Sequence, residues 1–150
     1  MGRHDDLFVT ELWDSSASFT AEGEAVGEEH PANLGASLGL IRPAEVPAAQ
    51  VHMGYCWINP TDEPALWVHP HVHPDQDEVL IWMGSDPENP KDLGGRLTMT
   101  IDGEEHIVTT TGSVFIPRGT PHCPLGWESV ERPIRFISLF LGPDYNAINL

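Results

Sequence analysis

The chain after residue 48 alternates apolar and polar positions over short stretches that end at Pro, Gly or Asn. In residues 51–58 every second position is a large apolar residue, and Asn59-Pro60 ends the run. Such a period of two predicts strands, because successive side chains of a strand point to opposite faces. Further strands are predicted at residues 38–41, 66–73, 78–83, 96–101, 106–110, 114–116 and 134–141.

Turn-forming residues separate these stretches and no long apolar period of 3.6 is visible. The chain has 14 Gly and 14 Pro, residues 85–95 read as a loop, and Asp102-Gly103 is a strong hairpin signal. Many short strands with closely spaced turns predict an all-β sandwich or barrel. Residues 1–48 are less regular, with a possible strand at 7–13. We therefore expect an irregular N-terminal extension (1–48) that packs on a β-barrel domain (49–150).

The predicted strand 78–83 is apolar on both faces. Glu78, Leu80 and Trp82 share one side, and the other side carries Val79, Ile81 and Met83. A strand of this kind must be covered on both faces. Its outer side is therefore expected to pack on the N-terminal segment or on a second subunit, and a homodimer is the expectation.

The charge balance narrows the classes of partner. Seven Lys and Arg stand against 23 Asp and Glu, which gives a formal charge of −16. Nucleic acids and anionic membrane surfaces would be repelled, so neither is expected as a partner. No apolar run is long enough for a signal peptide or a bilayer span, and Cys56 and Cys123 do not make a disulfide framework. A cytoplasmic location is expected, and the acidic residues within 22–29 are expected to form a solvated loop.

A group of histidines is the strongest chemical signal. His69, His71 and His73 alternate, so they share one face at spacings of about 6.6 Å, from which two imidazoles can converge on one ion. The turn at residues 74–77 lets Glu78 open the next strand facing the same ion. His122, placed by the Pro-rich turn 117–121, is the natural candidate for a further ligand.

These residues form two blocks that resemble the paired motifs of the cupin superfamily, which are small jelly-roll barrels. The residues that carry the resemblance are His71, His73, Glu78 and Gly84 in the first block, and Gly112, Pro117, Gly119 and His122 in the second. Two positions depart from the pattern: Ala65 replaces an expected Gly and Gly126 an expected Asn. The resemblance implies a cupin-type double-stranded β-helix and one divalent metal ion held by His71, His73, Glu78 and His122.

Roles for the neighbouring residues follow from their positions. His69 is expected to be a hydrogen-bond partner of the ligands, a substrate contact or an acid–base group, and Glu78 could also act as a base. Leu80 and Trp82, which share the face of Glu78, are expected to line the substrate pocket. Arg135 and Arg118 are the candidates for binding an anionic substrate group.

A mixed nitrogen and oxygen ligand set leaves several metals open. Fe²⁺ is favoured, and Zn²⁺, Mn²⁺ and Ni²⁺ are possible. The leading hypothesis is a mononuclear non-haem Fe(II) dioxygenase that acts on a small, chelating, oxygenated substrate together with O₂. The first alternative is a non-redox cyclase, isomerase or lyase that uses the metal as a Lewis acid, as some polyketide cyclases of the superfamily do. The second alternative is a non-catalytic ligand-binding barrel.

Overall fold

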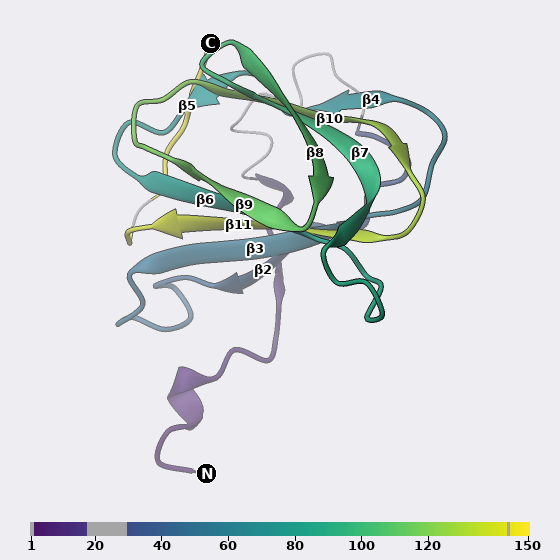
Figure 1. The fold of residues 1–150 in the computed structure, drawn as a ribbon. Helices are drawn as coiled ribbons and strands as arrows, with labels where there is room; N and C mark the ends of the chain where they lie inside the picture. The colour runs from purple at the N-terminus through teal and green to yellow at the C-terminus, as the bar shows by residue number, and fades with distance from the viewer. Residues whose placement is uncertain (1, 18–29, 144) are drawn as a thin grey trace.

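Two antiparallel sheets face each other across the core (Figure 1). The structure, a computed structural model, describes residues 2–17, 30–143 and 145–150; the acidic segment 22–29 lies outside them. The first sheet has the strand order β1-β2-β3-β11-β6-β9, and the second has the order β12-β5-β10-β7-β8, with β4 paired to β10. The elements are η1 (Asp5–Leu7), β1 (Trp13–Asp14), β2 (Leu38–Ile41), β3 (Val51–Ile58), β4 (Ala65–Trp67), β5 (His71–Val72), β6 (Asp77–Met83), β7 (Asp92–Ile101), β8 (Glu104–Thr110), β9 (Gly112–Ile116), β10 (His122–Val130), β11 (Ile134–Leu141) and β12 (Ile148–Asn149).

The predicted all-β architecture is confirmed. Strands β2, β3 and β11 have the predicted bounds. The β7–β8 hairpin turns at Asp102 and Gly103, which have φ values of 49° and 79°. Positive φ at both central residues is the requirement of the tight hairpin turn that an Asp-Gly pair signals. The described part of the chain contains no helix with the length and hydropathy that a bilayer crossing requires.

Two predicted strands are wrong in detail. Residues 7–13 do not form a strand: η1 ends at Leu7, and β1 begins only at Trp13. The stretch 66–73 is broken into β4 and β5, because Val68 has a φ of 66°. A β-branched residue at positive φ interrupts the regular alternation of a strand. His69 therefore does not continue the face on which His71 lies.

Strand β10 was missed by sequence pattern, although it lies at the centre of the second sheet. It pairs with β4 and β5 on one side and with β7 on the other. Pro124 and Gly126 interrupt its apolar run and are read as turn residues in a sequence. Its side chains Leu125 and Trp127 are nevertheless only 2% exposed, so β10 supplies much of the core.

The N-terminal extension contributes two strands to the first sheet. Strand β2 pairs with β3, and β1 pairs with β2 through Trp13 and Gly39. A Cβ atom at Gly39 would overlap the Trp13 ring, so the ring lies directly against the glycine backbone. Residues of the extension thereby reach the space between the two sheets. The domain boundary at residue 48 stays a prediction.

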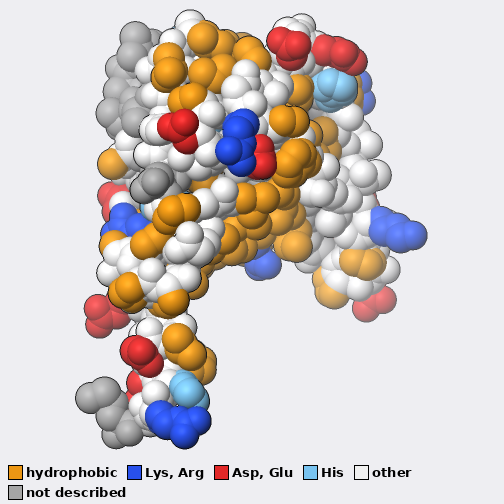
Figure 2. Space-filling model, turned by 90° about the vertical axis from the view of Figure 1, so that its left-hand side faces the viewer, with side chains coloured by type: hydrophobic (Ala, Val, Ile, Leu, Met, Phe, Trp, Pro, Cys, Tyr) orange, Lys and Arg blue, Asp and Glu red, His pale blue; other side chains and the backbone are white. Residues whose placement is uncertain are grey.

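The outer face of the first sheet is apolar and partly exposed. Val79 and Ile81 of β6 are paired with Leu139 and Ile137 of β11. Ile137 is buried, and the other three are half-buried. On the neighbouring strand, Phe115 is 55% exposed. The side of the molecule drawn in Figure 2 carries a broad band of apolar side chains. The expected homodimer stays a prediction.

Candidate metal centre

Three histidines of the second sheet converge with a carboxylate of the first. His71 in β5 is paired with His122, the first residue of β10, and His73 follows two residues after His71. Their potential ligand atoms all lie within 4.8 Å of one another. Each of the three histidines is 2% exposed. Glu78, on β6 in the facing sheet, is 3% exposed, so the group lies between the sheets.

Backbone carbonyl groups orient the three imidazoles. The Nδ1–H groups of His71, His73 and His122 donate to the carbonyl oxygens of His69 (2.7 Å), Asn146 (2.7 Å) and Thr120 (2.9 Å). A carbonyl oxygen only accepts, so each Nδ1 carries the proton and each Nε2 of a neutral ring carries the lone pair. Hydrogen bonds of this kind to the other ring nitrogen fix the orientation of metal-binding histidines in proteins.

The convergent atoms have the chemistry that a cation requires. The Nε2 atoms of His71 and His73 lie 3.1 Å apart, although two lone pairs cannot hydrogen-bond to each other. Glu78 Oε1 lies 3.1 Å from His122 Nε2 and 3.7 Å from His73 Nε2. Among the described residues, Glu78 Oε1 and His122 Nε2 are buried without a hydrogen-bond partner. A divalent cation would satisfy all four side chains, so the residues present fit the metal that the motifs imply.

Burial keeps two of these histidines in the metal-binding protonation state. The pKa of His71 is lowered from 6.5 to about 3. Desolvation is the largest cause, and the nearby His122 and His73 lower the pKa further. Desolvation also lowers the pKa of His73, and the neighbouring Glu78 carboxylate opposes that shift. The imidazolium is disfavoured at both positions, so the lone pairs stay available below the ordinary histidine pKa.

Once a chelator has removed any metal, the free energy of unfolding is expected to fall as the pH drops below about 6.5. The folded pKa of His71 is lowered to about 3, so between these pH values the unfolded chain binds a proton that the folded chain refuses. The His71 contribution is at most about 1.4 kcal/mol per pH unit. Urea unfolding between about pH 6.5 and about pH 5 measures the slope of the free energy of unfolding against pH.

The slope should become shallower in His71→Asn, which removes the buried titrating group. His106→Asn is the matched control, because the His106 side chain is 50% exposed and far less desolvated. Identical slopes in the wild type and in His71→Asn would contradict the assignment of the pH dependence to His71.

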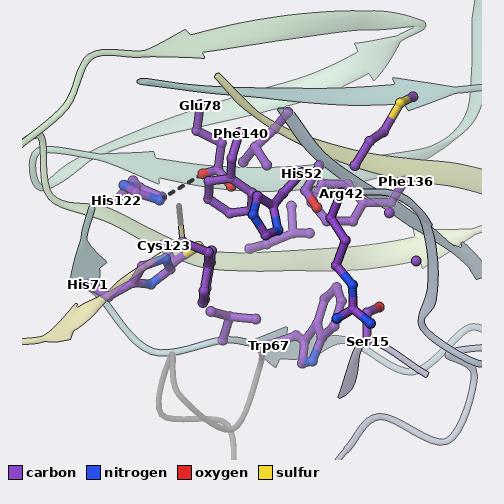
Figure 3. Close-up of a pocket in the computed structure, with 18 of the residues that line it drawn as sticks. Ser15, Arg42, His52, Trp67, His71, Glu78, His122, Cys123, Phe136 and Phe140 are labelled. Carbon is purple, nitrogen blue, oxygen red and sulfur yellow. Dashed lines mark ion pairs between the residues drawn. The ribbon is translucent and has the colours of Figure 1, made fainter. Parts of the chain in front are cut away.

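A cavity of about 180 Å³ opens beside the metal ligands. Figure 3 shows His71, His122 and Glu78 on one side of it. Its walls are largely apolar; the lining residues are Trp13, Ser15, Gly39, Arg42, His52, Met53, Gly54, Trp67, Val68, His71, Glu78, Leu80, His122, Cys123, Leu125, Phe136, Ser138, Phe140 and Tyr145. Leu80 lies where sequence reasoning placed it.

Three predicted pocket residues lie elsewhere. The half-buried His69 is not among the lining residues, and its backbone carbonyl contacts the His71 ring. Trp82 is 5% exposed and packs in the core beyond the cavity. Arg135 is exposed with its guanidinium 4.5 Å from the centre of the Trp57 ring, because alternation along β11 turns Phe136 inward and Arg135 outward. Arg118, the other candidate arginine, pairs with Asp77 at the surface.

Several cavity residues were missed by sequence reasoning. Trp13, Ser15 and Arg42 come from the extension, and no spacing along the chain relates them to the histidine motifs. Cys123 directly follows His122, and in a regular strand it would point away from the ligands. It lines the cavity instead, because its φ of 75° and the register shift that follows His122 break the alternation of β10.

Comparison with known proteins gives matches in structure only. No protein-family model and no curated protein sequence matches the chain. An oxalate oxidase in complex with glycolate is similar over 97% of this chain, with a TM-score of 0.56 and 19% identity. The match covers 64% of the oxalate oxidase chain, so this protein spans less than two thirds of its length.

Two further structures have a similar fold. KdgF from Halomonas sp. matches 79% of this chain and 86% of its own, with a TM-score of 0.51 and 14% identity. An oxalate decarboxylase from Bacillus subtilis, described with Mn(II) centres, matches 80% of this chain and 29% of its own, with a TM-score of 0.53 and 14% identity. At these identities the likeness shows the fold alone. It confirms the cupin fold that the paired motifs predicted.

Proposed function

We propose that this cupin-fold protein is a metal-dependent enzyme, in first place a mononuclear non-haem Fe(II) dioxygenase that acts on a small, chelating, oxygenated molecule. The observation that carries the proposal is the buried cluster of His71, His73 and His122 beside Glu78, at one side of an apolar cavity. Three neutral imidazoles and one carboxylate leave a divalent ion with a net positive charge. They also leave coordination positions for a ligand, as catalytic rather than structural sites do.

The residues of the chain divide the work of this site. His71, His73, His122 and Glu78 would hold the ion, and the backbone acceptors of their Nδ1–H groups keep the rings from turning. The bound metal would supply Lewis acidity and, as iron, a redox-active centre for the reaction with O₂. The apolar walls that include Leu80 and Phe136 would exclude water from the reacting atoms.

The second candidate is a Lewis-acid enzyme without a redox step, namely a cyclase, isomerase or lyase. It is favoured by the position of Glu78, whose Oε1 atom approaches both His122 and His73 and accepts no hydrogen bond from the described residues. A carboxylate so placed could take a proton from a chelated substrate. The distantly similar oxalate decarboxylase has Mn(II) centres, which supports a test of manganese among the possible metals.

The distinguishing experiment measures metal content and oxygen uptake on the same preparation. Untagged protein is purified without oxygen from cells supplied with iron, and the metal per chain is determined. Oxygen consumption is then screened with diketones, catechols and thiols. His71→Ala is the control, because it removes a proposed metal ligand. His71 lies in the second sheet, so Glu78 in the first sheet is kept.

Near-stoichiometric iron with substrate-dependent oxygen uptake, both lost in His71→Ala, is the result expected for the dioxygenase. Full occupancy by zinc, nickel or manganese with no oxygen uptake would transfer the assignment to Lewis-acid chemistry. Full occupancy by iron with no oxygen uptake would contradict the dioxygenase, and a site that takes up no divalent metal would overturn both enzymatic proposals.

A further inference from the structure

The cavity has a polar side that the metal chemistry does not use. Arg42 is the only Lys or Arg among its described lining residues, and Ser15 adds a hydroxyl group to the lining. Figure 3 shows Arg42 and Ser15 on the opposite side of the cavity from His71 and His122. The Arg42 side chain is 35% exposed, whereas the histidines are buried. The arginine therefore stands where the cavity meets solvent.

Two contacts hold the guanidinium of Arg42 in one orientation. Glu45 accepts from Nε at 2.8 Å and from Nη2 at 2.9 Å, so it occupies one side of the fork. The Arg42 Cζ atom lies 4.1 Å from the centre of the Trp13 ring, within the range of a cation–π contact. Trp13 is in turn seated against Gly39, where any side chain would overlap the ring. A charged group fixed in this way loses little freedom when it binds a ligand.

The fork of Arg42 keeps donors for a ligand. A guanidinium has five N–H groups, and the two bonded atoms, Nε and Nη2, use one edge. No hydrogen bond or ion pair with a described residue uses Nη1. The Nη1–Nη2 edge is the end-on edge that binds a carboxylate through two parallel hydrogen bonds. Glu45 thus neutralises the arginine in part without filling its binding edge.

The remaining walls limit the size of what the cavity takes. Between the two polar sides the lining is mainly apolar, with side chains such as Trp67, Leu80 and Phe136. The volume of about 180 Å³ is slightly larger than an engineered cavity of about 150 Å³ that holds benzene. One ring, or a short chain with a polar group at each end, matches this volume and this distribution of polarity.

We propose that the substrate carries a carboxylate at the end remote from its metal-chelating group, and that Arg42 binds this carboxylate through its Nη1–Nη2 edge. The chelating end rests on the function proposed above, and the carboxylate subsite does not. The formal charge of −16 repels anions at a distance, so the subsite acts at short range, inside a Debye length of about 8 Å at physiological salt.

Calorimetric titration with matched acids and amides tests the subsite. The zinc-loaded protein is used, because zinc does not oxidise the probes. The probes are 3,4-dihydroxyphenylacetate and its amide, which chelate, and phenylacetate and its amide, which do not. Homologues one carbon shorter and one carbon longer cover different spans between the metal and Arg42. At least one acid is expected to bind about tenfold more tightly than its amide.

Substitutions of Arg42 separate this subsite from general charge effects. Arg42→Gln should bring the acid-to-amide ratio close to one, and Arg42→Lys should keep part of it, while zinc content stays unchanged in both. Arg96→Gln is the matched control: it removes the same charge from an arginine that is paired with Glu128 outside the cavity. Its ratio should equal that of the wild type.

Equal affinity for acid and amide at every chain length would overturn the subsite, as would a preference that survives Arg42→Gln. Failure of the metal proposal gives a different pattern. In that case the catechols would bind no more tightly than the acids without hydroxyl groups, and the preference for acids over amides would persist.

Discussion

Replacing His122 with alanine is expected to empty the metal site. His122 offers a buried Nε2 atom that has no hydrogen-bond partner among the described residues, and it stands 3.1 Å from Glu78 Oε1. Its loss removes one of three converging imidazoles and leaves the carboxylate without its nearest neighbour. We expect the affinity for divalent metal to fall by more than about a hundredfold. About a hundredfold is the upper end of the loss when a residue that only supports a ligand is removed, and His122 is itself a proposed ligand. Metal content after desalting, measured by elemental analysis, should fall from about one per chain to near zero.

The control for this experiment is His69→Ala. His69 belongs to the same His-rich run but contacts His71 through its backbone carbonyl, at 2.7 Å, and an alanine keeps that carbonyl. Metal content should stay near the wild-type value. Loss of metal in His69→Ala, or full retention in a folded His122→Ala protein, would show that the ligands are a different set of histidines.

A methyl group at Gly84 is expected to destabilise the whole barrel. A Cβ atom there would overlap the carbonyl oxygen of Asp92 and would lie 3.2 Å from the Cα atom of Leu93. Both contacts are backbone atoms at the start of β7, so no rotamer change relieves them. Leu93 is completely buried, and displacing it would disturb the core. We expect Gly84→Ala to cost about 2–3 kcal/mol of unfolding free energy, which lowers Tm by roughly 4–12 °C in a chain of this size.

Gly112→Ala is the matched control, because Gly112 is the opening glycine of the second motif and is paired with Trp82, two residues before Gly84. The nearest atom to a Cβ there is Trp82 Nε1 at 3.5 Å, an ordinary contact distance. Calorimetry should show a Tm within a few degrees of the wild type, and equal losses in the two variants would contradict the steric explanation.

The local pattern of the chain was sufficient for most strands and for the approximate site. Period-two alternation located β3 and β11, and Asp102-Gly103 located the β7–β8 hairpin, since each depends on neighbours in sequence. The same local reasoning missed β10, because Pro124 and Gly126 carry turn signals that pairing on both edges overrides. Strand propensity is weak compared with such tertiary pairing.

The candidate metal ligands and the walls of the neighbouring cavity differ in how they are encoded. The spacing of the histidines and the resemblance to the cupin motifs brought His71, His73, Glu78 and His122 forward, because a metal ion demands particular atoms on strands of defined register. The walls of the cavity follow no such spacing. Sequence reasoning selected Arg135 for an anion, and the pleat of β11 turns it outward. Arg42 takes the place inside because the first sheet extends through β2 and β1, a pairing that joins segments with no common motif. The amino-acid sequence by itself therefore determined the fold class and the candidate metal ligands. Only the tertiary structure decided which other side chains share their cavity, since that depends on long-range strand pairing.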